Sequence, residues 1–218
     1  MPSKVYFLPL SLTIKKIEKI QFKKNMFKLY FENDISLIVF ADTIAKFALK
    51  PNINISKAEY EELVSYDKSN RVMFDALNLV SKKAYSQNSL REKLLQKGYN
   101  TQIAEKAIVR LKELNYLNDN NYAKDYASYL YRKGKGLFLI KAELERQGLD
   151  KDLIKEALVY IKEENEPSEV ILKILKTKFK NFNNKDKNET KKIISFFLRR
   201  GFVFEDISKA IKDSIIEK

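Results

Sequence analysis

The sequence predicts a mainly α-helical protein, in which an elongated tandem array of three-helix repeats follows a small N-terminal antiparallel β-meander and helices. Three observations support this fold class. Apolar and polar residues alternate in places between residues 13 and 41, whereas apolar residues recur with the helical period after Pro51. In addition, three of the five glycines lie at nearly even spacing, with gaps of 50 and 53 residues.

The alternation is clearest at Phe27, Leu29 and Phe31, which are separated by more polar residues. Because successive side chains of a strand point to opposite faces, this pattern indicates a strand with one buried face. We expect an earlier strand over residues 14–22, with a turn at Lys24-Asn25, and a later strand over residues 35–40.

Two signals mark the helices that follow the meander. Asp42 is expected to cap a short helix, which Pro51 ends because the residue before proline avoids helical angles. Ser56 to Glu59 match a capping box, in which each side chain accepts a hydrogen bond from the other residue's free backbone amide. The box predicts a helix to about Tyr66, and a second helix is expected over residues 70–84.

Gly98, Gly148 and Gly201 align three segments that share one pattern. Each glycine has an apolar residue four positions before it and another directly after it, and an alanine follows nine positions later. We infer a threefold repeat of about 50 residues. The three alanines are Ala107, Ala157 and Ala210.

Helix geometry explains both conserved features of the repeat. Glycine adopts positive φ at least cost just after a helix, and alanine lets the next helix approach closely. A third helix is expected in each repeat, over residues 73–84, 119–131 and 167–179, and consecutive repeats are expected to stack. The expected domains are 1–55 for the meander and short helix, 56–72 for a connecting helix, and 73–117, 118–165 and 166–218 for the repeats.

The 218-residue chain contains no His and no Cys. This removes the catalytic triads that need His, cysteine nucleophiles, His/Cys zinc sites and disulfides. These absences count against an enzyme, and we expect no cofactor. Asp150 and Asp152 stand where a helix start favours carboxylates, so we assign them to capping rather than to a metal site.

The apolar segments are too short for a membrane span. The N-terminal run from Val5 to Leu12 is interrupted by Pro9, and the run over residues 35–41 is far below the ~20 residues that cross a bilayer. We interpret the N-terminus as mature sequence and expect a cytoplasmic protein, which the absence of Cys also favours.

The net charge of +13 is spread over the whole chain, with +4 in residues 1–72, +4 in residues 73–165 and +5 in residues 166–218. Because summed charge steers association, this distribution favours a long surface that faces a polyanion or an acidic protein. Simple solvation of the surface by lysine is the alternative.

The segment Arg132-Lys133-Gly134-Lys135-Gly136 is the strongest local candidate for partner contact. Two glycines among cations predict a mobile loop whose amides and ammonium groups reach phosphates or acidic side chains. It is not a P-loop, because Gly136 stands where that motif has Ser or Thr. A plain solvated loop is the alternative.

Other basic residues share helix faces that stacked repeats would join into a stripe, although helix-surface charge balanced by glutamate is the alternative. Tyr122, Tyr126 and Tyr129 recur at helical spacing, which favours core packing over stacking with nucleic-acid bases. The candidate partner- or DNA-binding residues are Lys82, Lys83, Arg91, Lys93, Lys97, Arg132, Lys133, Lys135, Lys141, Arg146, Arg199 and Arg200.

Residues 13–212 resemble the RecX regulatory family, bacterial proteins that modulate the RecA recombinase. The order of the motifs, the repeat and the strand-rich start together carry this resemblance. Asn115 replaces a glycine of the family pattern, and Ser89 replaces a glutamate that would complete a capping box from Ser86. The matching positions are Asp42-Thr43, Lys46-Phe47, Leu49-Lys50, Lys82-Lys83, Ser86, Leu90-Arg91, Lys93-Leu94, Gly98-Tyr99, Leu117-Asn118-Asp119, Tyr122-Ala123, Lys135-Gly136, Ile140, Glu143-Leu144 and Gly148.

The resemblance implies a regulatory protein that binds RecA or its filament on single-stranded DNA. Proteins of this kind lie along the filament and mostly inhibit its growth, ATP hydrolysis, strand exchange and co-protease activity, and so act in recombination, DNA repair and the SOS response. Blocking of subunit addition, removal of subunits and stabilisation of filaments all stay open. We expect a monomer with weak direct DNA binding and no membrane partner. A nucleic-acid-binding protein that acts independently of RecA is the alternative.

Overall fold

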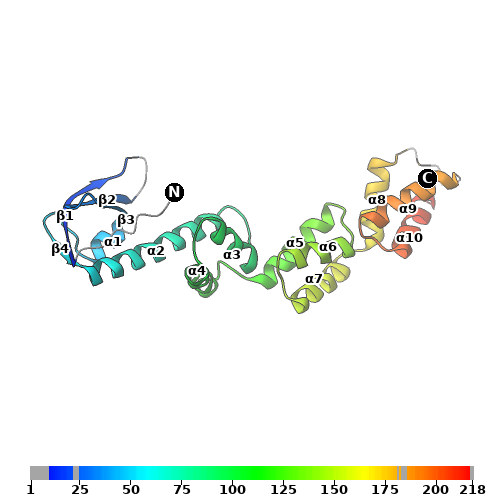
Figure 1. Ribbon diagram of the computed structural model, residues 1–218. Coiled ribbons are helices and arrows are strands. Elements are labelled where there is room, and N and C mark those ends of the chain that lie inside the picture. Colours follow the sequence, from blue (N-terminus) through cyan, green and yellow to red (C-terminus); the bar gives the residue numbers. More distant parts are fainter. Residues whose placement is uncertain (1–9, 22–24, 181, 183–185, 217–218) are drawn as a thin grey trace. The chain divides into compact units, whose positions relative to one another are not determined.

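The computed structural model describes residues 10–21, 25–180, 182 and 186–216, in which it forms four strands and ten helices (Figure 1). The chain divides into two compact units, residues 1–79 with 94–109 and residues 80–93 with 110–218. The strands are β1 (Ser11–Lys19), β2 (Met26–Phe31), β3 (Ser36–Phe40) and β4 (Asn54–Ser56). The helices are α1 (Ala41–Lys46), α2 (Lys57–Val80), α3 (Gln87–Gln96), α4 (Thr101–Glu113), α5 (Asp119–Arg132), α6 (Leu137–Arg146), α7 (Lys151–Glu164), α8 (Pro167–Lys178), α9 (Lys187–Arg199) and α10 (Phe204–Ile216).

The predicted fold class is confirmed, since the chain is mainly helical and starts with a small antiparallel sheet. The sheet order is β3-β2-β1-β4, and Leu29 of β2 lies opposite both Ile17 of β1 and Leu37 of β3. The edge strand β4 was not predicted, because three residues are too few to show an alternating pattern. It pairs antiparallel with the start of β1, where Ile55 lies opposite Leu12.

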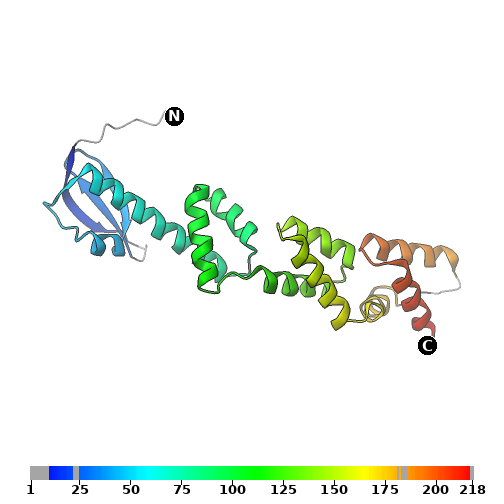
Figure 2. The same cartoon turned by 90° about the horizontal axis from the view of Figure 1, so that it is seen from below.

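The core of the first unit lies between the sheet and α2. Ile14, Leu29 and Val39 from three strands are fully buried and pack in one cluster with Leu63 of α2. Figure 2 shows that α2 starts beside the sheet and continues past it. The sheet therefore buries one face against the first half of a long helix.

The capping box that opens α2 is confirmed. The Ser56 N–H donates to Glu59 Oε2 at 2.7 Å, and the Glu59 N–H donates to Ser56 Oγ at 3.2 Å. The hydrogen bonds that the Ser56 N–H and the Ser56 hydroxyl donate to Oε2 lower the pKa of the Glu59 carboxyl. The predicted end of this helix near Tyr66 is wrong, however, since α2 continues without a break to Val80.

The reason lies in Asp67, which looks like a turn residue in the sequence but is only 4% exposed. Its Oδ1 accepts hydrogen bonds from the Phe40 N–H at 2.8 Å and the Thr43 hydroxyl at 2.9 Å. Its Oδ2 accepts a hydrogen bond from Arg71 Nη2 at 2.9 Å, and the same nitrogen donates to the Ile38 carbonyl at 2.8 Å. A carboxylate inside α2 thus joins this helix to the junction of β3 and α1.

Asp67, and not Asp42 as we expected, provides the side-chain acceptor at the start of α1. The N-cap of α1 is Phe40, which has no side-chain hydrogen bond of its own, and Asp42 lies within the first turn. Asp67 supplies an acceptor for the Phe40 N–H from another helix. The short α1 is therefore capped by tertiary structure, which local sequence does not reveal.

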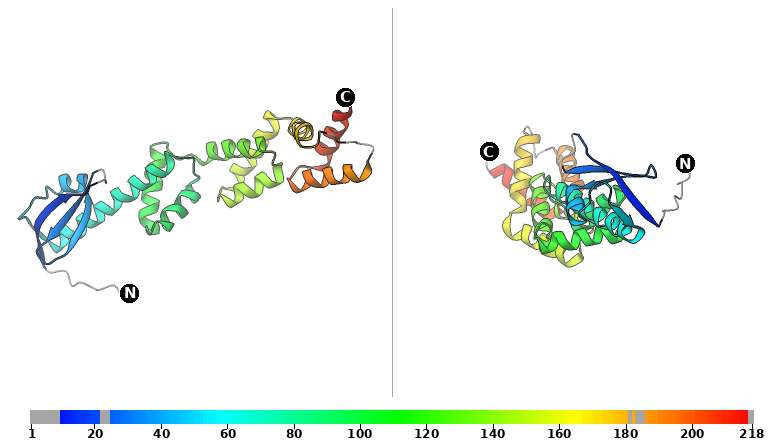
Figure 3. Two further views of the ribbon diagram at one scale, coloured as in Figure 1. Left: turned by 90° about the horizontal axis from the view of Figure 1, so that it is seen from above. Right: turned by 90° about the vertical axis from the view of Figure 1, so that its left-hand side faces the viewer.

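The second unit contains two successive groups of three helices, which we call the second repeat (α5–α7) and the third repeat (α8–α10) (Figure 3). Buried residues from both groups form one cluster, including Ile140, Ala157, Phe197 and Ala210. The predicted first helices of these repeats agree with α5 and α8 to within one residue.

The turns of the repeat also agree with expectation. Gly98, Gly148 and Gly201 have φ of +92°, +71° and +84°, and Asn115 takes the same left-handed conformation at +58°. Lys24 of the predicted turn and the segment from Val5 to Pro9 lie outside the described residues. The elongated form of the array and its domain boundaries stay predictions. Among the described helices, none is long and apolar enough to cross a membrane.

Replacing Asp67 with Ala should lower the free energy of unfolding of the first unit by about 3–5 kcal/mol, because Arg71 loses its carboxylate and the Phe40 N–H loses its acceptor. Urea denaturation followed by far-UV circular dichroism measures this change. Lys68→Ala, at the exposed neighbouring position, should change stability by less than about 0.5 kcal/mol. Equal stability of the two variants would contradict the role of Asp67.

Candidate functional site

The predicted basic loop joins α5 to α6, and its backbone amides are already bound. The Gly134 N–H donates to the Tyr131 carbonyl at 2.8 Å, and the Lys135 N–H donates to the Leu130 carbonyl at 3.1 Å. The Gly136 N–H donates to the Arg200 carbonyl of the third repeat at 2.7 Å. The expectation that these amides reach phosphates is therefore wrong, because they close the end of α5 and join two repeats.

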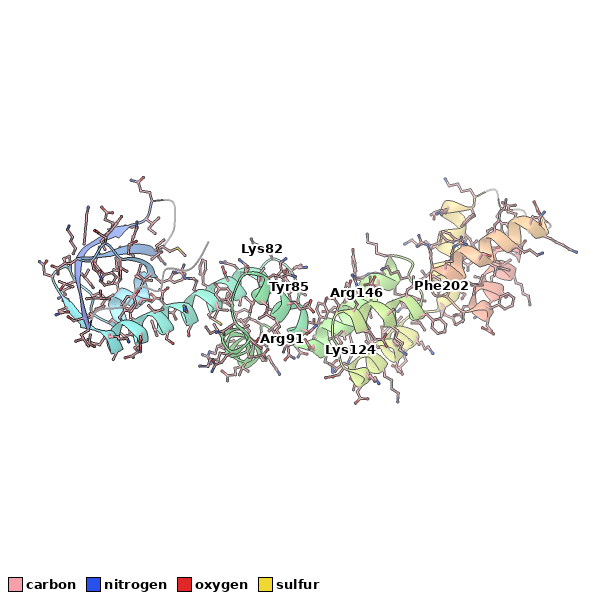
Figure 4. All side chains as sticks on the ribbon, in the orientation of Figure 1. Lys82, Tyr85, Arg91, Lys124, Arg146 and Phe202 are labelled. Carbon is pink, nitrogen blue, oxygen red and sulfur yellow. The ribbon has the colours of Figure 1, made fainter. Side chains whose placement is uncertain are left out.

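The two glycines of this loop allow a close approach between the repeats. A Cβ atom on Gly136 would lie 2.2 Å from the carbonyl carbon of Gly201, and one on Gly134 would lie 2.7 Å from Ile174 Cδ1. Figure 4 shows Phe202, which follows Gly201, where the second group of helices meets the third. Both loop glycines are buried. Close backbone packing requires glycine at Gly136, whereas Gly134 has a φ of +77°, which favours glycine.

The same kind of junction occurs one repeat earlier. Ser86, just before α3, donates its hydroxyl to the Gln147 carbonyl at 2.7 Å, and a Cβ on Gly148 would lie 2.6 Å from Asn88 Cβ. Ser86 corresponds to Gly136, and the pair Gln147-Gly148 corresponds to Arg200-Gly201. In both junctions the start of one middle helix fits against the glycine turn of the next middle helix. We call this contact the repeat junction.

Several candidate cations are held by acidic or carbonyl groups of the protein itself. Lys135 Nζ and Arg146 Nη2 both bind the carboxylate of Glu143, at 2.8 and 2.6 Å, and these contacts lower the pKa of Glu143. Arg200 donates to the Gly134 carbonyl at 3.3 Å. Two weaker pairs are Lys141 with Glu145 at 3.8 Å and Lys97 with Asp75 at 3.2 Å.

Other candidate cations extend from the surface. Arg132 and Lys133 are exposed at the end of α5, where the Lys133 ammonium lies 5.7 Å from the centre of the Tyr129 ring. Lys83 lies over the Tyr85 ring at 4.6 Å. The remaining candidates are Lys82, Lys93 and Arg199, which are exposed, and Arg91, which is half-buried and donates to Asn88 at 3.1 Å.

The three tyrosines of α5 are divided between core and surface. Tyr122 and Tyr126 pack against the core cluster, as predicted, and burial raises the pKa of Tyr122 to about 12. Tyr129 departs from the prediction because it is 48% exposed. The ring planes are stacked, with centres 5.5 Å apart for the first pair and 6.3 Å for the second. We call these three residues the tyrosine ladder.

A groove between α6 and α7 brings together lysines that our sequence analysis did not single out. Lys151, Lys155 and Lys162 line it from α7, beside the predicted Lys141 of α6. Their spacing of four and seven residues, which places them on one helix face, was the available signal. Figure 4 shows the second repeat with Arg146 and Lys124 labelled.

Nothing in this region has the form of a metal centre. Within the described part of the chain, no group of three or more acidic residues could hold a cation. Asp150 is the N-cap residue of α7 and Asp152 lies in its first turn, at the expected positions, but the Asp150 side chain makes no capping hydrogen bond. The described residues can offer cations, a stacked aromatic ladder and a lysine-lined groove to a partner.

The fold and these surfaces define a helical repeat protein with exposed basic residues. Family models describe two parts of the chain, "RecX, first three-helix domain" at residues 75–111 and "RecX, second three-helix domain" at residues 118–158. The first and second repeats of this chain are therefore similar to the two three-helix domains of RecX proteins.

Full-length relatives and solved structures agree with this similarity. "Regulatory protein RecX" of Clostridium beijerinckii is 29% identical over 200 residues, covering 90% of this chain and 93% of the relative. The protein of the same name from Caldanaerobacter subterraneus is 26% identical over 189 residues, covering 87% and 93%. A crystal structure of regulatory protein RecX has a TM-score of 0.64 at 17% identity and covers 92% of this chain and 99% of its own. RecX from Lactobacillus salivarius has a TM-score of 0.59 at 22% identity, covering 69% and 99%.

Gly136→Ala should weaken the repeat junction by about 3 kcal/mol or more, since the backbone of Gly201 has no room for the new methyl group. Gly98→Ala is the control, because its Cβ meets nothing within 4 Å and only the left-handed angle costs about 1–2 kcal/mol. Urea denaturation measures the loss of stability in both variants. Amide hydrogen exchange at Phe138, whose N–H donates to the Gly201 carbonyl, reports on the repeat junction itself. A smaller loss for Gly136→Ala than for Gly98→Ala would contradict the steric explanation.

Proposed function

We propose that this protein regulates RecA in the cytoplasm, by binding RecA or its filament on single-stranded DNA and mostly inhibiting filament growth. ATP hydrolysis, strand exchange and co-protease activity would fall together, because each depends on the filament. The similarity to RecX domains and to full-length RecX proteins carries this proposal. The protein would act by occupying a surface rather than by catalysis.

The repeat junction supports binding to a polymer. It joins the second and third repeats through a backbone hydrogen bond and a contact without side-chain space, so neighbouring repeats hold a fixed register. Repeats in register can contact successive subunits of a regular partner, and linked weak contacts gain strength from their high effective concentration. A protein with one flexible joint at each turn would lose this advantage.

The positive charge of the protein supports the same proposal, because it would favour the first encounter with the partner. The net charge of +13 attracts acidic or nucleic-acid partners, and Arg132 and Lys133 extend into solvent beside the repeat junction. Binding would shift the equilibrium between growing and inactive filaments only if the protein has different affinities for these two states. Arg132 and Lys133 are the natural first contacts, because they are exposed and, unlike Lys135 and Arg146, are not paired with Glu143.

Added in substoichiometric amounts, the purified protein should reduce the DNA-dependent ATP hydrolysis of RecA from the same organism. A coupled ATPase assay across a wide titration measures this effect. Arg132→Glu with Lys133→Glu should require at least about tenfold more protein for the same inhibition. Lys68→Glu with Lys106→Glu, which makes the same charge change at exposed sites of the first unit, is the control. Unchanged hydrolysis at every ratio would disprove the proposal.

The tyrosine ladder favours a second candidate function, direct binding of single-stranded DNA independently of RecA. Bases stack on exposed aromatic rings, and each stack contributes about 1–3 kcal/mol. Tyr129 offers a half-exposed ring at the end of the ladder, with the Lys133 ammonium above it to meet a phosphate.

Tyr129→Ala should weaken binding of a 20-nucleotide thymidine oligomer by about fivefold or more, whereas Tyr116→Ala should leave it unchanged. Tyr116 is a fitting control because it is also exposed, at 58%, but lies outside the ladder. Fluorescence anisotropy at several salt concentrations measures both affinity and the number of phosphate contacts. Equal losses in the two variants would rule out the ladder as the DNA site.

A further inference from the structure

The groove between α6 and α7 combines an apolar floor with a basic rim. It has a volume of about 490 Å³ and opens to solvent. Ile154, which is buried, forms the floor with Leu158 and Val159, and Val159 is 45% exposed. The rim carries four lysines and one glutamate, namely Lys141, Lys151, Lys155, Lys162 and Glu145.

These lysines are available to a partner. Lys141 forms a long ion pair of 3.8 Å with Glu145, which is more than half exposed to water. Within the described residues, Lys151, Lys155 and Lys162 form no ion pair. Three cations thus surround exposed aliphatic carbon without a salt bridge, although Lys162 also interacts electrostatically with Asp206 over a longer distance.

The repeat does not require this arrangement. Through the turn glycines, the four lysine positions correspond to Arg91, Thr101, Glu105 and Lys112 in the first repeat and to Ile194, Phe204, Ser208 and Ile215 in the third. The first repeat thus has cations at two of the four positions and the third repeat has none, whereas every repeat shares the turn glycine and the alanine. A cation at all four positions occurs in the second repeat alone.

The balance of charge differs between two neighbouring hollows on α7. The groove is lined by four lysines and one glutamate. A second hollow shares Lys155 and Val159 with the groove, but it is lined by two lysines and three acidic residues, namely Lys124, Lys155, Asp152, Glu156 and Glu163. The excess of positive charge is therefore greater in the groove.

We propose that this groove binds an acidic amphipathic helix of a partner protein. A helix presents apolar residues at spacings of three and four, which suit the floor of Ile154, Leu158 and Val159. Its flanking Asp and Glu residues meet the lysines. Lys151 and Lys162 are eleven residues apart on α7, about 16 Å, so the bound helix needs about three turns.

Nucleic acid suits this groove less well than a helix does. A phosphate backbone would bind the lysines but would gain nothing from covering an aliphatic floor. None of the described residues that line the groove is aromatic, so a base finds no ring on which to stack. The groove and the tyrosine ladder therefore recognise different chemistry.

A fluorescein-labelled synthetic peptide of 14 residues tests the proposal with the full-length protein. Leucines at positions 3, 6, 7, 10 and 13 form one helical face, and glutamate and alanine fill the others. Fluorescence anisotropy should show saturable binding. A scrambled peptide of the same composition and a peptide with lysine in place of glutamate should each bind at least tenfold more weakly. Equal binding of the scrambled peptide would overturn the proposal.

Two variants locate the binding. Lys155→Glu with Lys162→Glu removes rim charge, and Val159→Asp places a carboxylate on the floor at an exposed position that folding tolerates. Each should weaken peptide binding at least tenfold, whereas Lys68→Glu with Lys106→Glu should not. Circular dichroism checks folding, and amide hydrogen exchange should show protection of α6 and α7 by the peptide.

Unchanged affinity in both groove variants, or protection elsewhere, would disprove the groove as the site. Loss of oligonucleotide binding in the rim variant, with no peptide bound by the wild type, would assign the groove to nucleic acid and also overturn the proposal. The peptide assay contains no RecA, so its outcome is separate from the outcome of the ATPase titration.

Discussion

The close approach of Gly136 to Gly201 governs the arrangement of the second unit. A backbone hydrogen bond of 2.7 Å from the Gly136 N–H to the Arg200 carbonyl, a second from the Phe138 N–H to the Gly201 carbonyl at 3.3 Å, and a space too small for one methyl group place the third repeat against the second. The loop that connects α5 to α6 is basic, but its backbone serves this contact. Its lysine and arginine side chains are consequently presented from a rigid base, which favours recognition because little freedom is lost on binding.

Internal pairing divides the basic residues into two groups with different roles. Glu143 holds Lys135 and Arg146 beside the junction, while Arg132, Lys133 and the lysines of α7 extend into solvent. Net charge alone does not distinguish these groups. The first group stabilises the repeat, and the second is free to meet a partner.

Local rules predicted the features that depend on neighbouring residues. Positive φ at the three turn glycines, the capping box at Ser56 and the left-handed Asn115 all follow from backbone geometry within a few positions. The continuous α2 could not be predicted, because Asp67 is buried by contacts with residues 24 and 27 positions away. The packing of the basic loop could not be predicted either, because Gly136 lies against Gly201, 65 residues later. The groove could not be predicted because two helices are needed to form it.

The three turn glycines look alike in the sequence but experience different constraints. At Gly201 a neighbouring backbone lies against the residue, and at Gly148 the side chain of Asn88 does so, whereas nothing lies within 4 Å of a Cβ on Gly98. Only its positive φ restricts Gly98. Asn115 also has a positive φ, so asparagine can adopt this conformation in the same chain. In related chains, asparagine should therefore replace Gly98 more often than it replaces Gly201. The absence of glycine from a turn then does not mean that the repeat is absent.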